Sequence, residues 1–250
     1  MATRHSAFIT GAGRNIGRAT ALELARRGVS LIINGARNRA ICDAVAAEAA
    51  AHGVEAVVLM GDVGDAAEAK RLAEAALQRF GTIDILVNNA AIRPHQGFLE
   101  ISDADWHRVI DIDLNAAMHF ARAFLPGMIA QGWGRIVNFT GMNAIMGNPA
   151  GAHISAAKHG IWGLTKALAR EFGPQGITVN AISPTFVRVP QTESLLADEA
   201  FYERLVARIP LRRIAETDDL VGAILFFCSD ASSFVTWQVL TLDGGLTATQ

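Results

Sequence analysis

The sequence contains few of the residues that mark specialised classes of protein. Of its 250 residues, two are cysteines, one is a tyrosine and seven are prolines. Cys42 and Cys228 lie far apart in the chain, so they predict neither a disulfide framework nor a four-ligand zinc site. We therefore expect no metal and a reducing, cytoplasmic location.

Charge of one sign is also lacking. The 22 basic side chains nearly balance the 24 acidic ones, and lysines and arginines form no cluster larger than a pair, so we expect no nucleic acid partner. No apolar run approaches the roughly 18 residues that span a bilayer, and we expect no membrane partner. The composition favours a small-molecule substrate.

What the chain does contain is a regular alternation of short apolar runs and helix-forming stretches. Short apolar runs are typical of parallel strands that are covered on both faces. The alternation predicts a single α/β domain over residues 1–250, a Rossmann-like, doubly wound parallel sheet with helices on both faces. The expected strands are 7–10, 30–34, 56–59, 83–87, 135–139, 177–181 and 239–242, and the expected helices are 16–27, 39–51, 66–80, 105–128 and 156–172. The alternation lapses at 185–212, where we expect a substrate lid.

A glycine-rich stretch, Thr-Gly-Ala-Gly-Arg-Asn-Ile-Gly at 10–17, joins the first expected strand to the first helix. Amides at a helix N-terminus attract a pyrophosphate, and glycines let it approach closely. An arginine near the end of the second strand accommodates the 2′-phosphate of NADP, whereas a carboxylate there binds the ribose of NAD. Arg37 follows that strand and Arg14 lies in the glycine loop, which favours NADP(H) over NAD(H). Alternatively, Arg37 is only a solvated residue of the next helix.

These motifs resemble the short-chain dehydrogenase/reductase family over essentially the whole chain. The loop is similar to the family pattern Thr-Gly-x3-Gly-x-Gly, with Asn15 at the middle glycine, and further landmarks are Asn88-Asn89-Ala90-Ala91 and Leu242-Asp243-Gly244-Gly245. The resemblance implies an NAD(P)-dependent oxidoreductase. The cofactor-binding positions then are Gly11, Arg14, Asn15, Ile16, Gly17, Arg37, Asp62, Val63, Asn89, Ala90, Lys158, Pro184 and Val187.

The resemblance breaks at the catalytic positions. Relatives carry an Asn, Ser, Tyr and Lys set; Lys158 matches the lysine, which in the family binds the nicotinamide ribose. Asp113, Gly141 and Ile154 stand at the positions of the Asn, Ser and Tyr. The chain's one tyrosine, Tyr202, falls in the expected lid. Since a positioned general acid accelerates a reaction by about 10²- to 10⁴-fold, ketone reduction by the usual route is expected to be slow.

Three functions fit this atypical site. The first is reduction of an acceptor that needs no phenol, such as an imine or iminium ion, with Asp113 stabilising the cation; alternatively, Asp113 is structural and paired with Lys158. The second is conventional carbonyl chemistry with a proton route through water, Lys158, His153 or Tyr202, although His153 is expected to be partly exposed and Thr140 to be a core residue. The third is a non-redox lyase, isomerase or hydrolase, or a nucleotide-sensing protein.

The resemblance also implies a substrate pocket and an assembly surface. Glycine and isoleucine in place of serine and tyrosine make the pocket more apolar, which suits a bulky apolar substrate. Relatives commonly form tetramers or dimers, so we expect a homo-oligomer that uses 116–128, 161–172 and the last strand. The expected pocket residues are Arg93, His95, Met142, Met146, Ile154, Phe186 and Tyr202.

Overall fold

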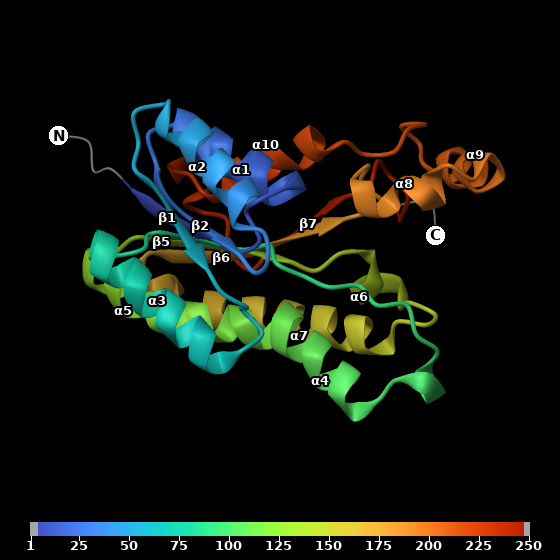
Figure 1. Ribbon diagram of the computed structural model, residues 1–250, viewed down its shortest axis with the longest axis horizontal. Helices are drawn as coiled ribbons and strands as arrows, with labels where there is room; N and C mark the ends of the chain where they lie inside the picture. Colours follow the sequence, from blue (N-terminus) through green and yellow to red (C-terminus); the bar gives the residue numbers. More distant parts are fainter. Residues whose placement is uncertain (1–4, 248–250) are drawn as a thin grey trace.

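The computed structural model describes residues 5–247 and places a parallel sheet between two layers of helices (Figure 1). Its seven strands lie in the order β3-β2-β1-β4-β5-β6-β7. The order reverses between β1 and β4, and this is where open α/β sheets bind their ligands, beyond the carboxyl ends of the strands. The predicted Rossmann-like architecture is confirmed. The strands are β1 (Ser6–Ile9), β2 (Ser30–Gly35), β3 (Ala56–Met60), β4 (Ile85–Asn88), β5 (Gly134–Phe139), β6 (Ile177–Pro184) and β7 (Val239–Leu242).

Helices pack on both faces of the sheet because both faces are apolar. Phe8 of β1 packs against Phe120 and Phe124 on one face, with ring centroids 4.7 and 5.4 Å away. A second core lies on the other face and includes Ile33 and Leu220. Figure 1 shows α1 (Asn15–Arg26), α2 (Arg39–Ala50) and α10 (Thr217–Phe227) on one face and α3 (Ala66–Phe80), α5 (Ala116–Gln131) and α7 (Ala152–Phe172) on the other.

The helix predicted at 105–128 is interrupted in the structure. It divides into α4 (Asp103–Ile110), a π-helical turn, η2 (Asp111–Asn115), and α5. Single π-helical turns shift the register of a helix and are frequent at functional sites. This turn contains Asp113.

Several elements were not predicted. The α10 sequence is mostly apolar, so it lacks the mixture of charged and apolar residues that marked the other helices. The segment 185–212, the expected lid, holds two helices, α8 (Pro190–Leu196) and α9 (Glu199–Arg208), which Figure 1 shows beyond the carboxyl end of β6. The remaining short helices are η1 (Phe98–Glu100), α6 (Met142–Met146), η3 (Gly173–Gln175) and η4 (Asp230–Ser232).

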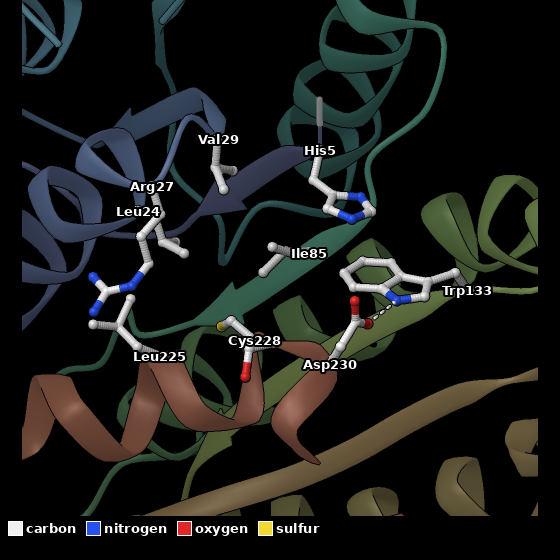
Figure 2. A pocket seen from close by; sticks show the side chains of 10 residues that line it. His5, Leu24, Arg27, Val29, Ile85, Trp133, Leu225, Cys228 and Asp230 are labelled. Carbon is white, nitrogen blue, oxygen red and sulfur yellow. Dashed lines mark hydrogen bonds between the residues drawn. The ribbon is translucent and has the colours of Figure 1, made fainter. Parts of the chain in front are cut away.

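A hollow of about 200 Å³ lies at the amino-terminal edge of the sheet (Figure 2). The Trp133 ring stacks on His5 at a centroid distance of 3.9 Å, and its Nε1 donates to Asp230 Oδ1 at 2.8 Å. Burial raises the pKa of the nearby Cys228 thiol to about 12, so this thiol stays protonated. The residues lining the hollow include none of the predicted site residues, all of which lie within the described part of the chain.

Of the helices within residues 5–247, none has the length and apolar character that crossing a membrane requires.

Candidate active site

The loop between β1 and α1 forms a cradle lined by glycine. Gly11 has φ +62°, a conformation that favours glycine. A Cβ on Gly17 would stand 2.5 Å from the Gly11 carbonyl oxygen and 2.7 Å from Asn89 Nδ2, so the loop closes only around a glycine. Asn15, at the middle position of the motif, has φ +50°, which Asn tolerates better than most residues.

Thr10 and Asn89 fasten this loop to the end of β4. The Asn89 side-chain amide donates to the carbonyl oxygens of Thr10 at 2.9 Å and Gly11 at 3.1 Å. In return, the Thr10 hydroxyl accepts from the backbone amides of Asn89 and Ala90, both at 2.9 Å. Asn89 and Ala90 therefore hold the shape of the cradle.

The cradle fits a dinucleotide pyrophosphate. Arg14, the N-cap of α1, is extended, and no side chain in residues 5–247 caps the helix. The amides of the first turn, which includes Ile16 and Gly17, therefore remain free for an anion, at the positive end of the helix dipole. Close approach is possible because glycine leaves the surface of the loop open.

The residues expected around the adenosine differ in exposure. Arg37 is exposed just after β2. Burial tends to raise the pKa of Asp62, but hydrogen bonds from Arg108 and the Gly64 amide, and the charge of Arg37, outweigh it and lower the pKa. Val63 is 5% exposed and packs in the core, so little of its side chain is open to a ligand.

A buried ion pair lies between α7 and the π-helical turn. Lys158 Nζ is 3.1 Å from Asp113 Oδ2, and the two side chains are 3% and 0% exposed. Asp113 Oδ1 accepts from the backbone amide of Ile92 at 2.9 Å, and a guanidinium nitrogen of the half-exposed Arg93 lies 3.8 Å from Oδ2. Asp113 thus joins three segments that are distant in the sequence.

The same burial makes Lys158 an unusual lysine. Desolvation lowers its pKa because a charged amine loses its hydration; Asp113 opposes this shift and Arg93 reinforces it, and the net change is downward. An ammonium with a lowered pKa releases its proton more readily than an exposed lysine does. Lys158 can therefore move a proton as well as carry a charge.

The two neighbouring catalytic positions lack a side-chain donor. Ile154 is 1% exposed and packs with Val109 and Ala157. Gly141, after β5, has φ +91° and ψ 167°, a combination that is essentially restricted to glycine, although a Cβ there would meet only the Pro184 carbonyl oxygen, at 3.7 Å. Backbone conformation, rather than lack of space, excludes other residues at position 141.

The expectation that His153 is partly exposed is wrong. His153 is fully buried, and within residues 5–247 neither ring nitrogen has a hydrogen-bond partner. The reason is that α4 packs against α7, and the loop before η1 lies beside the start of α7, where the Gln96 backbone amide donates to the Ala150 carbonyl at 2.8 Å. Thr140 is 2% exposed, which confirms it as a core residue.

Several of the predicted pocket residues meet beside the lid. Met142, Phe186 and Tyr202 pack around one apolar cluster, and the Thr185 hydroxyl donates to Met142 Sδ at 2.8 Å. The Tyr202 ring lies 6.0 Å from the Arg188 guanidinium. Of the other predicted pocket residues, Arg93 and His95 are exposed on a loop and Met146 is 45% exposed. Two of the residues predicted to bind the cofactor lie close by in the sequence: Pro184 ends β6, and Val187 is 7% exposed and bridges to Ala215.

One contact in the site was not predicted. The Gln191 side-chain amide, on α8, lies 3.0 Å from Asn15 Nδ2. When the amide nitrogen faces Asn15, the amide oxygen accepts from both terminal nitrogens of Arg14, at 2.9 and 3.1 Å. Gln191 therefore links the lid segment to the glycine loop, and no local sequence signal marks this role.

Comparison with known proteins identifies the family of this fold and site. Residues 11–247 match the family model described as enoyl-(acyl carrier protein) reductase. The chain is 39% identical over 245 residues to a 3-oxoacyl-(acyl-carrier-protein) reductase of Synechocystis sp., a match that covers 98% of this chain and 97% of that protein. It is also similar to a gluconate 5-dehydrogenase of Burkholderia cenocepacia crystallised with NADP and tartrate, with a TM-score of 0.90, 34% identity, and coverage of 98% of this chain and 95% of that one. The chain therefore belongs to the short-chain dehydrogenase/reductase family of oxidoreductases.

Proposed function

We propose that the enzyme is an NADP(H)-dependent oxidoreductase that reduces carbon–nitrogen double bonds, in imines or iminium ions, in preference to ketones. The observation that carries this proposal is the buried Lys158–Asp113 pair, 3.1 Å apart, next to an aliphatic residue at position 154. In the family resemblance, Asp113, Gly141 and Ile154 replace the usual Asn, Ser and Tyr. The site thus has a cationic proton donor and lacks the usual phenol.

The cofactor assignment rests on the cradle and on two arginines. Residues 11–17 and the first turn of α1 would hold the pyrophosphate, and Arg14 and Arg37 would face the 2′-phosphate, with Lys158 near the nicotinamide ribose. When bound, NADPH supplies the hydride for the acceptor carbon. The presence of NADP in the structure of the Burkholderia gluconate 5-dehydrogenase supports the proposed preference for NADP(H) over NAD(H).

Lys158 would provide the proton. An imine nitrogen is a far stronger base than a ketone oxygen, so an ammonium of lowered pKa can protonate it without the help of a phenol. One N–H bond of Lys158 breaks, one forms on the substrate nitrogen, and the positive charge moves with the proton. Because the total charge beside Asp113 is unchanged, its carboxylate stabilises the cation before and after the transfer.

A matched pair of bicyclic substrates tests this proposal. We expect NADPH oxidation with 3,4-dihydroisoquinoline to have a kcat/KM at least about tenfold above that with α-tetralone, since only the ketone needs the missing acid, which is worth about 10²- to 10⁴-fold. Lys158→Met should abolish the imine activity, and circular dichroism has to establish that the variant folds, because the substitution leaves Asp113 buried without its partner. Equal or faster turnover of the ketone would contradict the proposal.

Carbonyl reduction or alcohol oxidation is the second candidate, because the named activities of the similar proteins are of this type. It would use a proton route through Lys158, the buried His153 or Tyr202, and the same assay would show the opposite preference. Tight NADPH binding without oxidation of NADPH by either substrate would instead favour a non-redox or sensing role.

The expectations about organisation remain proposals. Residues 1–250 would act as one cytoplasmic domain, with 185–212 as the substrate lid, and as a dimer or tetramer. Phe120 and Phe124 of α5 are fully buried within the chain, whereas Phe234 and Leu240 near β7 are exposed, so the β7 side is the more available assembly surface.

A further inference from the structure

Two arginines on α9 border an apolar hollow in the lid segment. The hollow has a volume of about 320 Å³ and is lined by Phe186, Phe201, Leu205, Arg204 and Arg208. Phe186 and Phe201 meet edge to face, with ring centroids 6.0 Å apart. Arg204 and Arg208 are four residues apart in one helix, so they lie on the same face of it.

These two arginines differ from others in the same region of the chain. Arg188 pairs with Glu216, and Arg213 pairs with Asp219. The guanidinium groups of Arg204 and Arg208 form no ion pair or hydrogen bond with any residue in the described range 5–247. Like charges at this helical spacing repel each other, and an anion between them would remove that repulsion.

The hollow borders an apolar cluster that extends toward the substrate side of the candidate active site. Phe186 follows the end of β6 by two residues and packs in the same cluster as Met142 and Tyr202. Met142 comes directly after Gly141, just beyond the end of β5. A substrate that extends from the Lys158 region along this apolar cluster would therefore reach α9.

We propose that Arg204 and Arg208 form a subsite for an anionic group, a carboxylate or a phosphate, at the end of an apolar substrate. This inference rests on the proposed function and narrows it to amphiphilic anions. The aromatic walls take the carbon skeleton, and the guanidinium groups bind the oxyanion through charge-assisted, bidentate hydrogen bonds.

Binding of matched probes to the NADPH-loaded enzyme tests the subsite without any turnover. By calorimetric titration, we expect 4-phenylbutanoate or 4-phenylbutyl phosphate to bind about tenfold or more tightly than the neutral 4-phenylbutanamide, since hydrogen bonds between charged groups are stronger than those between neutral ones. The anion that binds more tightly shows whether the subsite prefers a carboxylate or a phosphate. Arg204→Gln, Arg208→Gln and the double variant should reduce the preference stepwise, to less than about threefold.

Arg170→Gln removes an exposed arginine from the far end of α7 and serves as the charge-matched control; it should keep the full preference. Equal binding of acid and amide by the unaltered enzyme would overturn the subsite, as would a preference that survives in the double variant. If the double variant does not fold, the single variants and the unaltered enzyme decide. Failure to reduce imines would overturn the proposed function alone, because this assay requires no reaction.

Discussion

Asp113 illustrates how strongly one residue depends on its neighbours in this protein. A carboxylate with no exposed surface is unfavourable unless it is paired, and here Lys158 and the Ile92 amide both compensate it. Removal of one member of such a buried pair typically destabilises a protein by about 3–5 kcal/mol, because the other charge is left alone. Removal of Asp113 destabilises the protein less than this, because the remaining Lys158 can lose its proton and become neutral.

Asp113→Asn should change the pH dependence of imine reduction. Reduction of a neutral imine requires protonated Lys158, so this activity falls as the pH rises through the pKa of the lysine. Burial lowers that pKa and Asp113 raises it, so loss of the carboxylate lowers the pKa further and moves the alkaline limb of kcat/KM to lower pH.

Asp105→Asn provides the control for this shift. Asp105 accepts hydrogen bonds from Ser102 and Gln96 and forms no ion pair with a residue in the range 5–247. The pH profile of kcat/KM of the Asp105→Asn variant should match that of the unaltered enzyme. An unmoved alkaline limb in Asp113→Asn would show that Lys158 is not the proton donor.

The backbone conformation of Gly141 predicts how a substitution there changes the free energy of unfolding. Gly141→Ala should lower the free energy of unfolding by about 1–3 kcal/mol, because φ +91° disfavours any Cβ even though the space is open. Gly163→Ala, at an exposed position inside α7, should instead stabilise the protein by about 0.5–1 kcal/mol. Thermal melts measure the Tm of both variants, and Tm shifts of the same sign would contradict this prediction.

At the scale of elements, the turns after the strands carry several of the residues that we predict to bind the cofactor. The turn between β2 and α2 is the clearest case: Asn38 caps α2 by accepting from the Ile41 amide at 3.3 Å, which leaves Arg37 outside the helix and exposed. Arg39, two residues later, is already helical and lies 3.4 Å from Asp43. The two exposed arginines therefore have different surroundings.

Arg37→Leu should weaken NADPH binding by about 10- to 100-fold and leave NADH binding nearly unchanged, because only NADPH presents a 2′-phosphate. Arg39→Leu also removes one positive charge, at the start of α2, and should change the affinity for either cofactor little. Fluorescence titration of the reduced cofactors measures all four affinities. Equal losses in the two variants would mean that Arg37 contributes only general charge.

At the scale of the whole molecule, the lid segment and the glycine loop meet through Gln191. The contact joins α8 to the N-terminus of α1 across a long stretch of sequence. Binding of NADPH should order the glycine loop, and Gln191 would transmit that order to 185–212.

Gln191→Ala should therefore reduce the protection that NADPH gives to 185–212 against limited proteolysis, by about two- to tenfold, as expected for one or two exposed hydrogen bonds. Gln175→Ala, which alters a glutamine in η3 on another part of the surface, should retain full protection. Equal protection of both variants by NADPH would show that the lid closes independently of this contact.

The sequence by itself determined the parallel α/β architecture, the glycine loop and the position of Lys158, because these depend on local periodicity and on residues close together in the chain. It did not determine the π-helical turn inside 105–128, the burial of His153 or the helix α10, since each depends on what packs against it. Only the tertiary structure decided that Asp113 pairs with Lys158, that Ile154 packs against Val109 and that Gln191 reaches Asn15. These contacts join distant segments, and their free energy comes from burial and charge pairing that no local pattern records.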